Sequence, residues 1–150
     1  MINFFLIFLL LINGNTFSKD IKQTTKAIQI VESENNPNAI GDTKYYNYSV
    51  GLGQIRLKTG VWIINNLVSE GIIKKMLLKD LRRLGIKKIL LNPIINTYLT
   101  KTYLNWLKKY HKGKLDEAII SYNTGQGAKK YIRNNLGKLY LEKVKKNLNN

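Results

Sequence analysis

Apolar residues recur every three or four positions in successive stretches of this chain from residue 20 onward. That spacing places them on one face of an amphipathic helix, whereas a half-buried strand would alternate apolar and polar residues. It predicts helices over about residues 20–34, 60–69, 72–83, 93–110, 116–122 and 137–147. The sequence shows no strand pattern of useful length, no internal repeat and no linker, and its 150 residues are enough for one domain. We therefore expect a single all-α, mainly helical domain.

Turn-forming residues mark the ends of these predicted helices. The first helix should end at residues 35–37, because the residue before Pro37 avoids the helical conformation. The helix over 93–110 should begin with Asn92 as its N-cap and Pro93 at its first helical position. Residues 38–51 are rich in Gly, Asn, Asp and Tyr, which predicts an irregular loop.

The first eighteen residues carry no charged side chain, and residues 4–12 are an unbroken apolar run. This run is too short for a membrane-spanning helix, which needs about 20 residues. It is typical of the core of a signal peptide, and Thr16-Phe17-Ser18 suits cleavage before Lys19, although no Lys or Arg precedes the run. We expect residues 1–18 to be a signal peptide and 19–150 a periplasmic or secreted domain. The alternative is an uncleaved membrane anchor.

The chain carries 25 basic and 9 acidic residues, a formal net charge of +16, and no cysteine. Such a basic protein should be attracted to polyanions: nucleic acid, an anionic membrane surface or a carboxylate-bearing wall polymer. The alternative is that Lys simply fills exposed positions. The absence of cysteine excludes a disulfide scaffold, a thiol nucleophile and a Cys-based zinc site.

Few side chains could carry chemistry. The single histidine, His111, lies in a polar run that we expect to be a solvated helix end, and nothing near it in sequence suggests a catalytic triad. No cluster of metal-ligating residues is present, and Gly51-Leu52-Gly53 lacks the lysine of a phosphate-binding loop. We therefore expect no metal and no cofactor, which leaves carboxylate chemistry.

Two carboxylates lie at the end of the first predicted helix, just before the loop. Glu32 and Glu34 are two positions apart, so a helix would turn them about 200° away from each other. Glu32 adjoins the apolar side and should point toward the interior or a cleft, while Glu34 should point to water. From periodicity alone, Glu32 is either a catalytic group or a buried structural carboxylate.

Four segments, in order, resemble a known family. Residues 32–39 are ESENNPNA, and residues 51–55 are GLGQI. Residues 91–96 are LNPIIN, followed by the pair Tyr103-Leu104, and residues 118–127 are AIISYNTGQG. They resemble the segments E-S-x-x-N-P-x-A, G-L-x-Q-I, D-P-x-x-N … Y-L and A-x-x-A-Y-N-A-G-x-G of the soluble lytic transglycosylase (SLT) catalytic domain, which is related to goose-type lysozymes.

This resemblance implies a lysozyme-like domain with a substrate groove. In that family the position of Glu32 is the single catalytic acid, and those of Gln54 and Tyr122 are groove residues near it. Asn123 belongs to the same segment as Tyr122. Gly51 either lets the backbone approach a sugar closely or serves only as a turn residue.

The chain departs from the family pattern in the loop after Glu32. Gly41 stands where the family often has a serine, and Ser49 is the candidate to replace it. The Met-Pro that follows G-L-x-Q-I in the family is Arg56-Leu57 here. These departures bear on substrate contacts more than on the chemistry.

The resemblance implies a peptidoglycan lytic transglycosylase that cuts the bond between N-acetylmuramic acid and N-acetylglucosamine and leaves 1,6-anhydro ends. We expect a monomer whose partner is the glycan strand and which binds no nucleic acid. One alternative is a goose-type lysozyme that hydrolyses the same bond, with Asp42 as the second carboxylate. Another is a non-catalytic wall-binding module of a secretion or conjugation apparatus.

Overall fold

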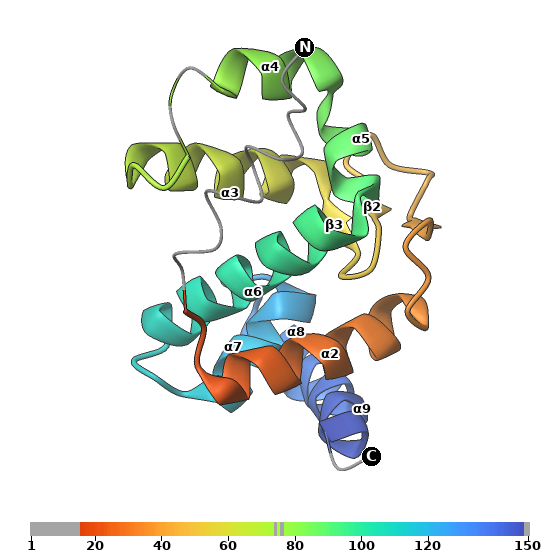
Figure 1. The fold of residues 1–150 in the computed structure, drawn as a ribbon. Coiled ribbons are helices and arrows are strands. Elements are labelled where there is room, and N and C mark those ends of the chain that lie inside the picture. Colours follow the sequence, from red (N-terminus) through yellow and green to blue (C-terminus); the bar gives the residue numbers. More distant parts are fainter. Residues whose placement is uncertain (1–15, 74, 76, 149–150) are drawn as a thin grey trace.

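Helices account for most of the residues that the computed structural model describes, which are 16–73, 75 and 77–148 (Figure 1). The mainly helical fold predicted from the sequence is confirmed. The elements, in chain order, are α2 (Lys19–Ser33), β1 (Ile40–Gly41), β2 (Ser49–Val50), β3 (Ile55–Arg56), α3 (Leu57–Ser69), α4 (Leu77–Leu84), α5 (Ile86–Leu91), α6 (Pro93–Tyr110), α7 (Leu115–Thr124), α8 (Lys130–Ile132), the π-helical turn η1 (Arg133–Gly137) and α9 (Lys138–Leu148).

The best-marked helix boundary in the sequence is also the one that the structure reproduces most closely. The Asn92 side chain accepts hydrogen bonds from the backbone N–H groups of Ile94 and Ile95, at 3.1 and 3.0 Å, and Pro93 is the first residue of α6. The cap therefore satisfies two of the N–H groups that a helix start leaves without partners.

The loop predicted to be irregular over residues 38–51 contains two strands, β1 and β2. They form an antiparallel sheet with β3 in the order β1-β2-β3, in which Gly41 pairs with Ser49 and Val50 pairs with Ile55. Each strand has two residues, which is too short for an alternating pattern to appear in the sequence. The sequence did not predict the short helices α5 and α8, because six and three residues are too few to show a helical repeat of apolar positions.

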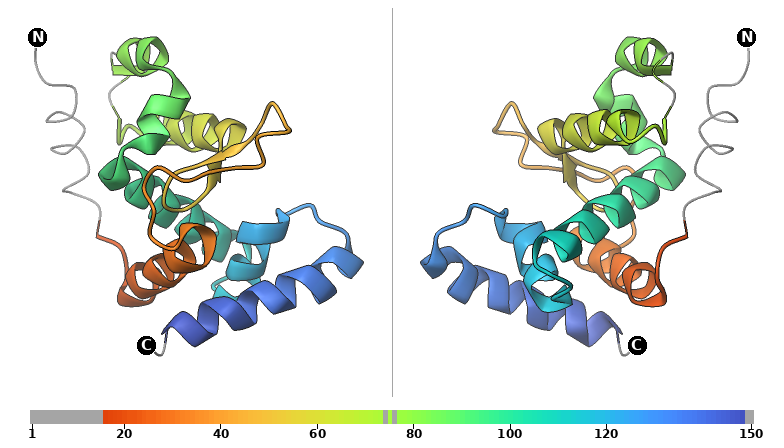
Figure 2. Two further views of the ribbon diagram at one scale, coloured as in Figure 1. Left: turned by 90° about the vertical axis from the view of Figure 1, so that its right-hand side faces the viewer. Right: turned by 90° about the vertical axis from the view of Figure 1, so that its left-hand side faces the viewer.

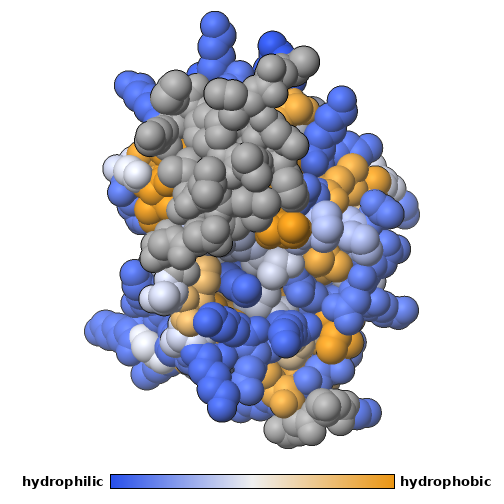
Figure 3. All heavy atoms as spheres, in the orientation of Figure 1, coloured by the Kyte–Doolittle hydropathy of each residue, from blue (hydrophilic) through white to orange (hydrophobic). Residues whose placement is uncertain are grey.

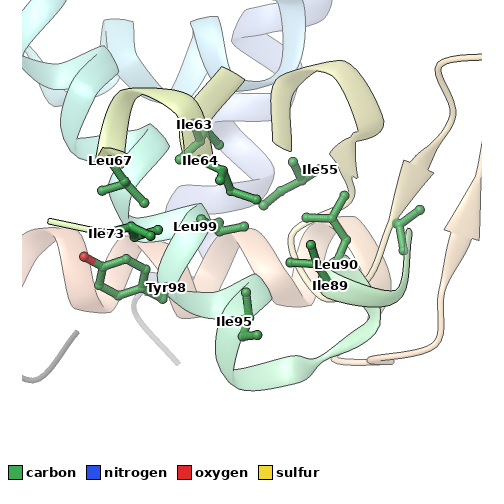
Figure 4. Close-up of a cluster of buried hydrophobic side chains, with 11 residues drawn as sticks. Ile55, Ile63, Ile64, Leu67, Ile73, Ile89, Leu90, Ile95, Tyr98 and Leu99 are labelled. Carbon is green, nitrogen blue, oxygen red and sulfur yellow. The ribbon is translucent and has the colours of Figure 1, made fainter. Parts of the chain in front are cut away.

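Two groups of elements pack on either side of α6, as Figure 2 shows. The first group joins the sheet, α3, α5 and the first half of α6 around a buried cluster that includes Ile55, Ile63, Leu67, Leu90 and Leu99 (Figure 4). The second joins α2, α7, α9 and the second half of α6 around a cluster that includes Ile21, Ile28, Leu104, Ile119 and Val144. Because both clusters share α6, this helix fixes the two groups relative to each other.

The described residues that Figure 3 leaves in view are mostly hydrophilic, with scattered apolar patches between them. Most of the predicted signal peptide, residues 1–15, lies outside the described residues; Phe17 is described, and its ring packs edge-on against Tyr98 with centroids 5.6 Å apart. Among the described residues, no helix combines the length and apolar character needed to cross a membrane.

One buried amide ties α6 to the sheet and to α5. Asn96 is fully buried, and its Oδ1 accepts a hydrogen bond from the Gly53 backbone N–H at 2.8 Å. Its Nδ2 donates to the backbone carbonyls of Val50 at 2.9 Å and Leu90 at 2.8 Å. Asn96 thus provides hydrogen-bond partners for three backbone groups in the interior of the protein, where water does not provide them.

We expect Asn96→Ala to lower the free energy of unfolding by about 3 kcal/mol or more, because it leaves three backbone groups without these hydrogen bonds. Urea unfolding followed by circular dichroism measures this change. The matched control is Asn65→Ala on the exposed surface of α3, which should change stability by less than about 0.5 kcal/mol. Equal effects of the two substitutions would contradict this account of Asn96.

Candidate active site

A cleft of about 400 Å³ lies where the end of α2 faces the sheet, α6 and α7. Its volume falls within the usual range for small-molecule sites, about 300–1,000 Å³. Five of the six site residues expected from the sequence, and the candidate second carboxylate Asp42, line it; the full lining is Glu32, Asp42, Ser49, Gln54, Ile55, Arg56, Thr59, Tyr103, Tyr122, Asn123, Thr124 and Gly125.

Glu32 is in the last turn of α2, half-buried at the wall of this cleft. The Tyr140 hydroxyl donates a hydrogen bond to its Oε1 at 2.6 Å. Burial raises the pKa of Glu32 above its ordinary value, and the negative charge of Asp42 raises it further, while the Tyr140 hydrogen bond lowers it. Within the described part of the chain Glu32 is in no ion pair. Burial has the largest effect, so the carboxyl group tends to keep its proton.

Glu34 is exposed, as predicted. The sequence placed Glu34 on the outer face of the helix, but α2 ends at Ser33, and Glu34 is its C-cap. Glu34 has the left-handed conformation with φ 53°, and Asn35 follows with φ 61°. These two residues reverse the chain before Pro37, and they leave Glu32 as the last acidic residue within the helix.

Ser49 and Gln54 form one hydrogen-bonded unit in the cleft wall. The Ser49 hydroxyl donates to Gln54 Oε1 at 2.8 Å, and Gln54 Nε2 donates to the backbone carbonyls of Ala39 and Gly51 at 3.1 and 2.9 Å. A side chain at Gly41 would place its Cβ 2.8 Å from the Ser49 hydroxyl. The Ser49 hydroxyl therefore occupies the space beside Gly41, as expected if it replaces a serine at that position.

Tyr122 connects α7 to the loop between β2 and β3. Its hydroxyl donates to the Gly53 backbone carbonyl at 2.7 Å, and burial raises the pKa of the phenol, which therefore stays protonated. Asn123, the next residue, is exposed and lines the same cleft. Both residues lie beside the cleft that holds Glu32.

Gly51 requires a correction, because it is not among the residues that line the cleft. It is buried with φ 77°, and a Cβ there would lie 2.3 Å from Asn96 Nδ2 and 2.4 Å from the Leu90 carbonyl oxygen. The close approach that requires glycine is therefore to the protein interior and not to a sugar.

Asp42 brings a second carboxylate into the cleft. It forms an ion pair with Arg56 at 2.8 Å, and about half of each side chain is exposed. Arg56 also donates to the Asn47 carbonyl at 3.1 Å, which holds the guanidinium beside Asp42. The Asp42 carboxylate is thus paired with a positive charge, whereas the Glu32 carboxyl is in no ion pair among the described residues.

His111 is more constrained than the sequence predicted. Its Nε2 lies 2.7 Å from the hydroxyl of the buried Ser121, to which Arg133 Nη1 also donates at 2.7 Å. Glu117 pairs with Arg133 and not with the imidazole. Burial lowers the pKa of His111, with a smaller contribution from the positive charge of Arg133. Ser121 is enclosed and accepts from a cation, so these residues are structural.

Tyr140 and Tyr103 are two residues of the site that the sequence analysis did not assign to it. Tyr140 of α9 reaches Glu32 from 108 positions away, and Tyr103 of α6 lines the cleft. Tyr103 belongs to the Tyr-Leu pair of a quoted motif, so that motif could have identified it. No local sequence signal points from Tyr140 to Glu32.

Comparison with sequence models of protein families gives a match over most of the chain. The sequence model of the family described as "Transglycosylase SLT domain" matches residues 13–144, which covers every cleft residue and Tyr140. No curated protein and no solved structure matches the chain.

We expect Tyr140→Phe to raise the pKa of Glu32, because the hydroxyl stabilises the carboxylate form and the substitution removes that hydrogen bond. A ¹³C NMR titration of the Glu32 carboxyl carbon measures the shift. Tyr110→Phe, at an exposed tyrosine of α6, is the control and should leave the titration unchanged. A lower or unchanged pKa in Tyr140→Phe would contradict the direction assigned to this hydrogen bond.

Proposed function

Because this chain belongs to the transglycosylase SLT domain family, whose members act on peptidoglycan as lytic transglycosylases, we propose that it cuts the β-1,4 bond between N-acetylmuramic acid and N-acetylglucosamine. In this proposal Glu32 acts first as the acid and then as the base, and the product carries a 1,6-anhydro end. The observation that carries the proposal is the half-buried Glu32 in the cleft wall, whose pKa is raised by burial.

The hydrogen bond from Tyr140 supports an assignment of the Glu32 proton to one of its two oxygens. Tyr140 donates to Oε1, so the acidic proton belongs on Oε2. In the first step Oε2 gives this proton to the glycosidic oxygen, and the bond from C1 of the muramic residue to that oxygen breaks. A raised pKa supports this step, because the group must hold its proton near neutral pH.

The second step needs a base and a nucleophile. The Glu32 carboxylate takes the proton of the C6 hydroxyl of the same muramic residue, and the C6 oxygen closes the bond to C1. This regenerates the protonated acid and consumes no water. Because the nucleophile is part of the substrate, the proximity advantage is large and no second carboxylate is needed.

Asp42 supports a second candidate function, the hydrolysis of the same bond by a goose-type lysozyme mechanism. Inverting and retaining glycosidases use two carboxylates, and Asp42 lines the cleft that holds Glu32. Its ion pair with Arg56 favours the first function, because Arg56 already occupies one of the carboxylate oxygens that would have to hold the attacking water.

We propose a periplasmic or secreted location, as expected from the N-terminal apolar run. The net charge of +16 would draw the enzyme toward the carboxylates of lactyl groups and stem peptides. This attraction weakens as salt is added, so it contributes to encounter more than to cleavage.

We expect Glu32→Gln to reduce cleavage of purified peptidoglycan sacculi by about 10³-fold or more, because it removes the group that gives and takes the proton in the proposed mechanism. The loss of sacculus turbidity measures the rate. Glu34→Gln is a closely matched control, since it makes the same change two residues along at an exposed position, and it should keep the parent rate. Full activity of Glu32→Gln would remove our catalytic assignment; a parent protein without turnover would favour a wall-binding module.

Asp42→Asn separates the two reactions. A transglycosylase should keep its rate to within about tenfold and still release 1,6-anhydro muropeptides, which are lighter than hydrolysed ones by one water. Mass spectrometry of the released muropeptides identifies the ends in both the parent and the variant. Reducing ends from the parent, together with loss of activity in Asp42→Asn, would establish the lysozyme mechanism instead.

A further inference from the structure

Residues 125–136, here called the edge segment, run from the end of α7 through α8 and most of η1 and border the cleft. Gly125 lines the cleft, and Gln126 lines an adjoining shallow hollow. Figure 2 shows the blue loop between α7 and α8, which projects from the body of the domain. Most residues of the edge segment are exposed, so its position depends on the side chains that attach it to α7.

Arg133 of η1 makes such an attachment. Its Nη1 donates a hydrogen bond to Ser121 Oγ at 2.7 Å, and its Nη2 forms an ion pair with Glu117. Both partners belong to α7, and Ser121 is fully buried. The guanidinium of the edge segment is therefore held by a hydroxyl in the interior of the protein as well as by a carboxylate at its surface.

His111, which caps the end of α6, contacts the same hydroxyl, with Nε2 2.7 Å from Ser121 Oγ. Arg133 only donates, so Ser121 accepts from it and has one hydrogen of its own to donate. Within the part of the chain that the structure describes, the Ser121 side chain makes no other hydrogen bond. Its hydrogen therefore belongs to His111 Nε2, which makes the imidazole neutral with its own proton on Nδ1.

Protonation of His111 would turn Nε2 from an acceptor into a donor. The Ser121 hydroxyl would then face two donors, and its own hydrogen would lose its acceptor inside the protein. The imidazolium would also lie close to the guanidinium of Arg133, whose charge Glu117 offsets in part. On α6 itself, the Tyr110 ring packs edge-on against the imidazole, with centroids 5.0 Å apart.

We propose that His111, Ser121 and Arg133 form an acid-sensitive switch that holds the edge segment on α7 only while His111 is neutral. Burial lowers the pKa of His111, the charge of Arg133 lowers it further, and Glu117 raises it. The switch therefore stabilises the attached segment above the ordinary pKa of histidine, about 6.5, and this stabilisation is lost as the pH falls through the lowered pKa of His111.

The effect of the switch on activity rests on the proposed function. Glu32 must be protonated when that reaction starts, so its own titration removes activity as the pH rises. Release of the edge segment removes activity as the pH falls, because the glycan strand loses one border of the cleft. The two groups therefore limit opposite sides of the pH profile.

The test measures backbone hydrogen–deuterium exchange by mass spectrometry in the full chain without substrate, with rates corrected for the intrinsic effect of pH. From about pH 7.5 to about pH 5, protection of residues 125–136 should fall about tenfold, the loss of about one hydrogen bond. Protection of α3 is the internal control and should not change. In His111→Gln the amide oxygen accepts the Ser121 hydrogen without titrating, so the edge segment should keep its protection.

An NMR titration of the His111 ring makes the test independent of any variant. Exchange of the edge segment in the parent should follow the same midpoint as the resonances of His111, the one histidine of the chain. Unchanged protection in the parent, an equal loss in His111→Gln, or a midpoint different from that of His111 would each overturn the switch.

Cleavage of sacculi should fall on the acid side in the parent and not in His111→Gln. Equal falls in the two proteins would overturn the role of the switch in cleavage. A parent that cleaves no sacculi but shows the expected exchange would overturn the proposed reaction alone.

Discussion

The amide of Asn96 is the interaction on which the geometry of the cleft depends. It holds the Gly53 N–H from one side, and Tyr122 holds the carbonyl of the same residue from the other. Gln54, the next residue, is thereby fixed with its side chain against Ser49 in the cleft wall. Because Asn96 belongs to α6, the helix shared by both hydrophobic clusters, the part of the cleft wall formed by Ser49 and Gln54 is attached to the helix that packs in both.

The environment of Glu32 is a balance between burial, which favours the protonated form, and the Tyr140 hydroxyl, which favours the carboxylate. An acid that must also serve as a base benefits from both, since it has to release its proton and take another during one reaction. The excess of positive charge on the chain opposes protonation, but the basic side chains are not paired with Glu32 among the described residues. The effect of burial on the pKa of Glu32 is therefore larger than the effect of the overall positive charge.

The parts of the structure that depend on neighbours in sequence could be predicted, and the parts that depend on distant contacts could not. The start of α6 follows from Asn92 and Pro93, and the position of Glu32 from the apolar face of α2. The three strands have two residues each, so their pairing leaves no periodic trace. The reason for the glycine at position 51 was misassigned, because its close neighbours lie more than thirty positions away in α5 and α6.

The hydrogen bond between Tyr140 and Glu32 joins α9 to α2, and these two helices pack directly on each other in the fold (Figure 2). A ribosome makes α2 long before α9, so the nascent polypeptide contains its acid without the hydroxyl that stabilises the acid's conjugate base. Proteolytic fragments that end before α9 share this defect. The hydrogen bond to Glu32 therefore forms only once α9 has been made and has packed on α2.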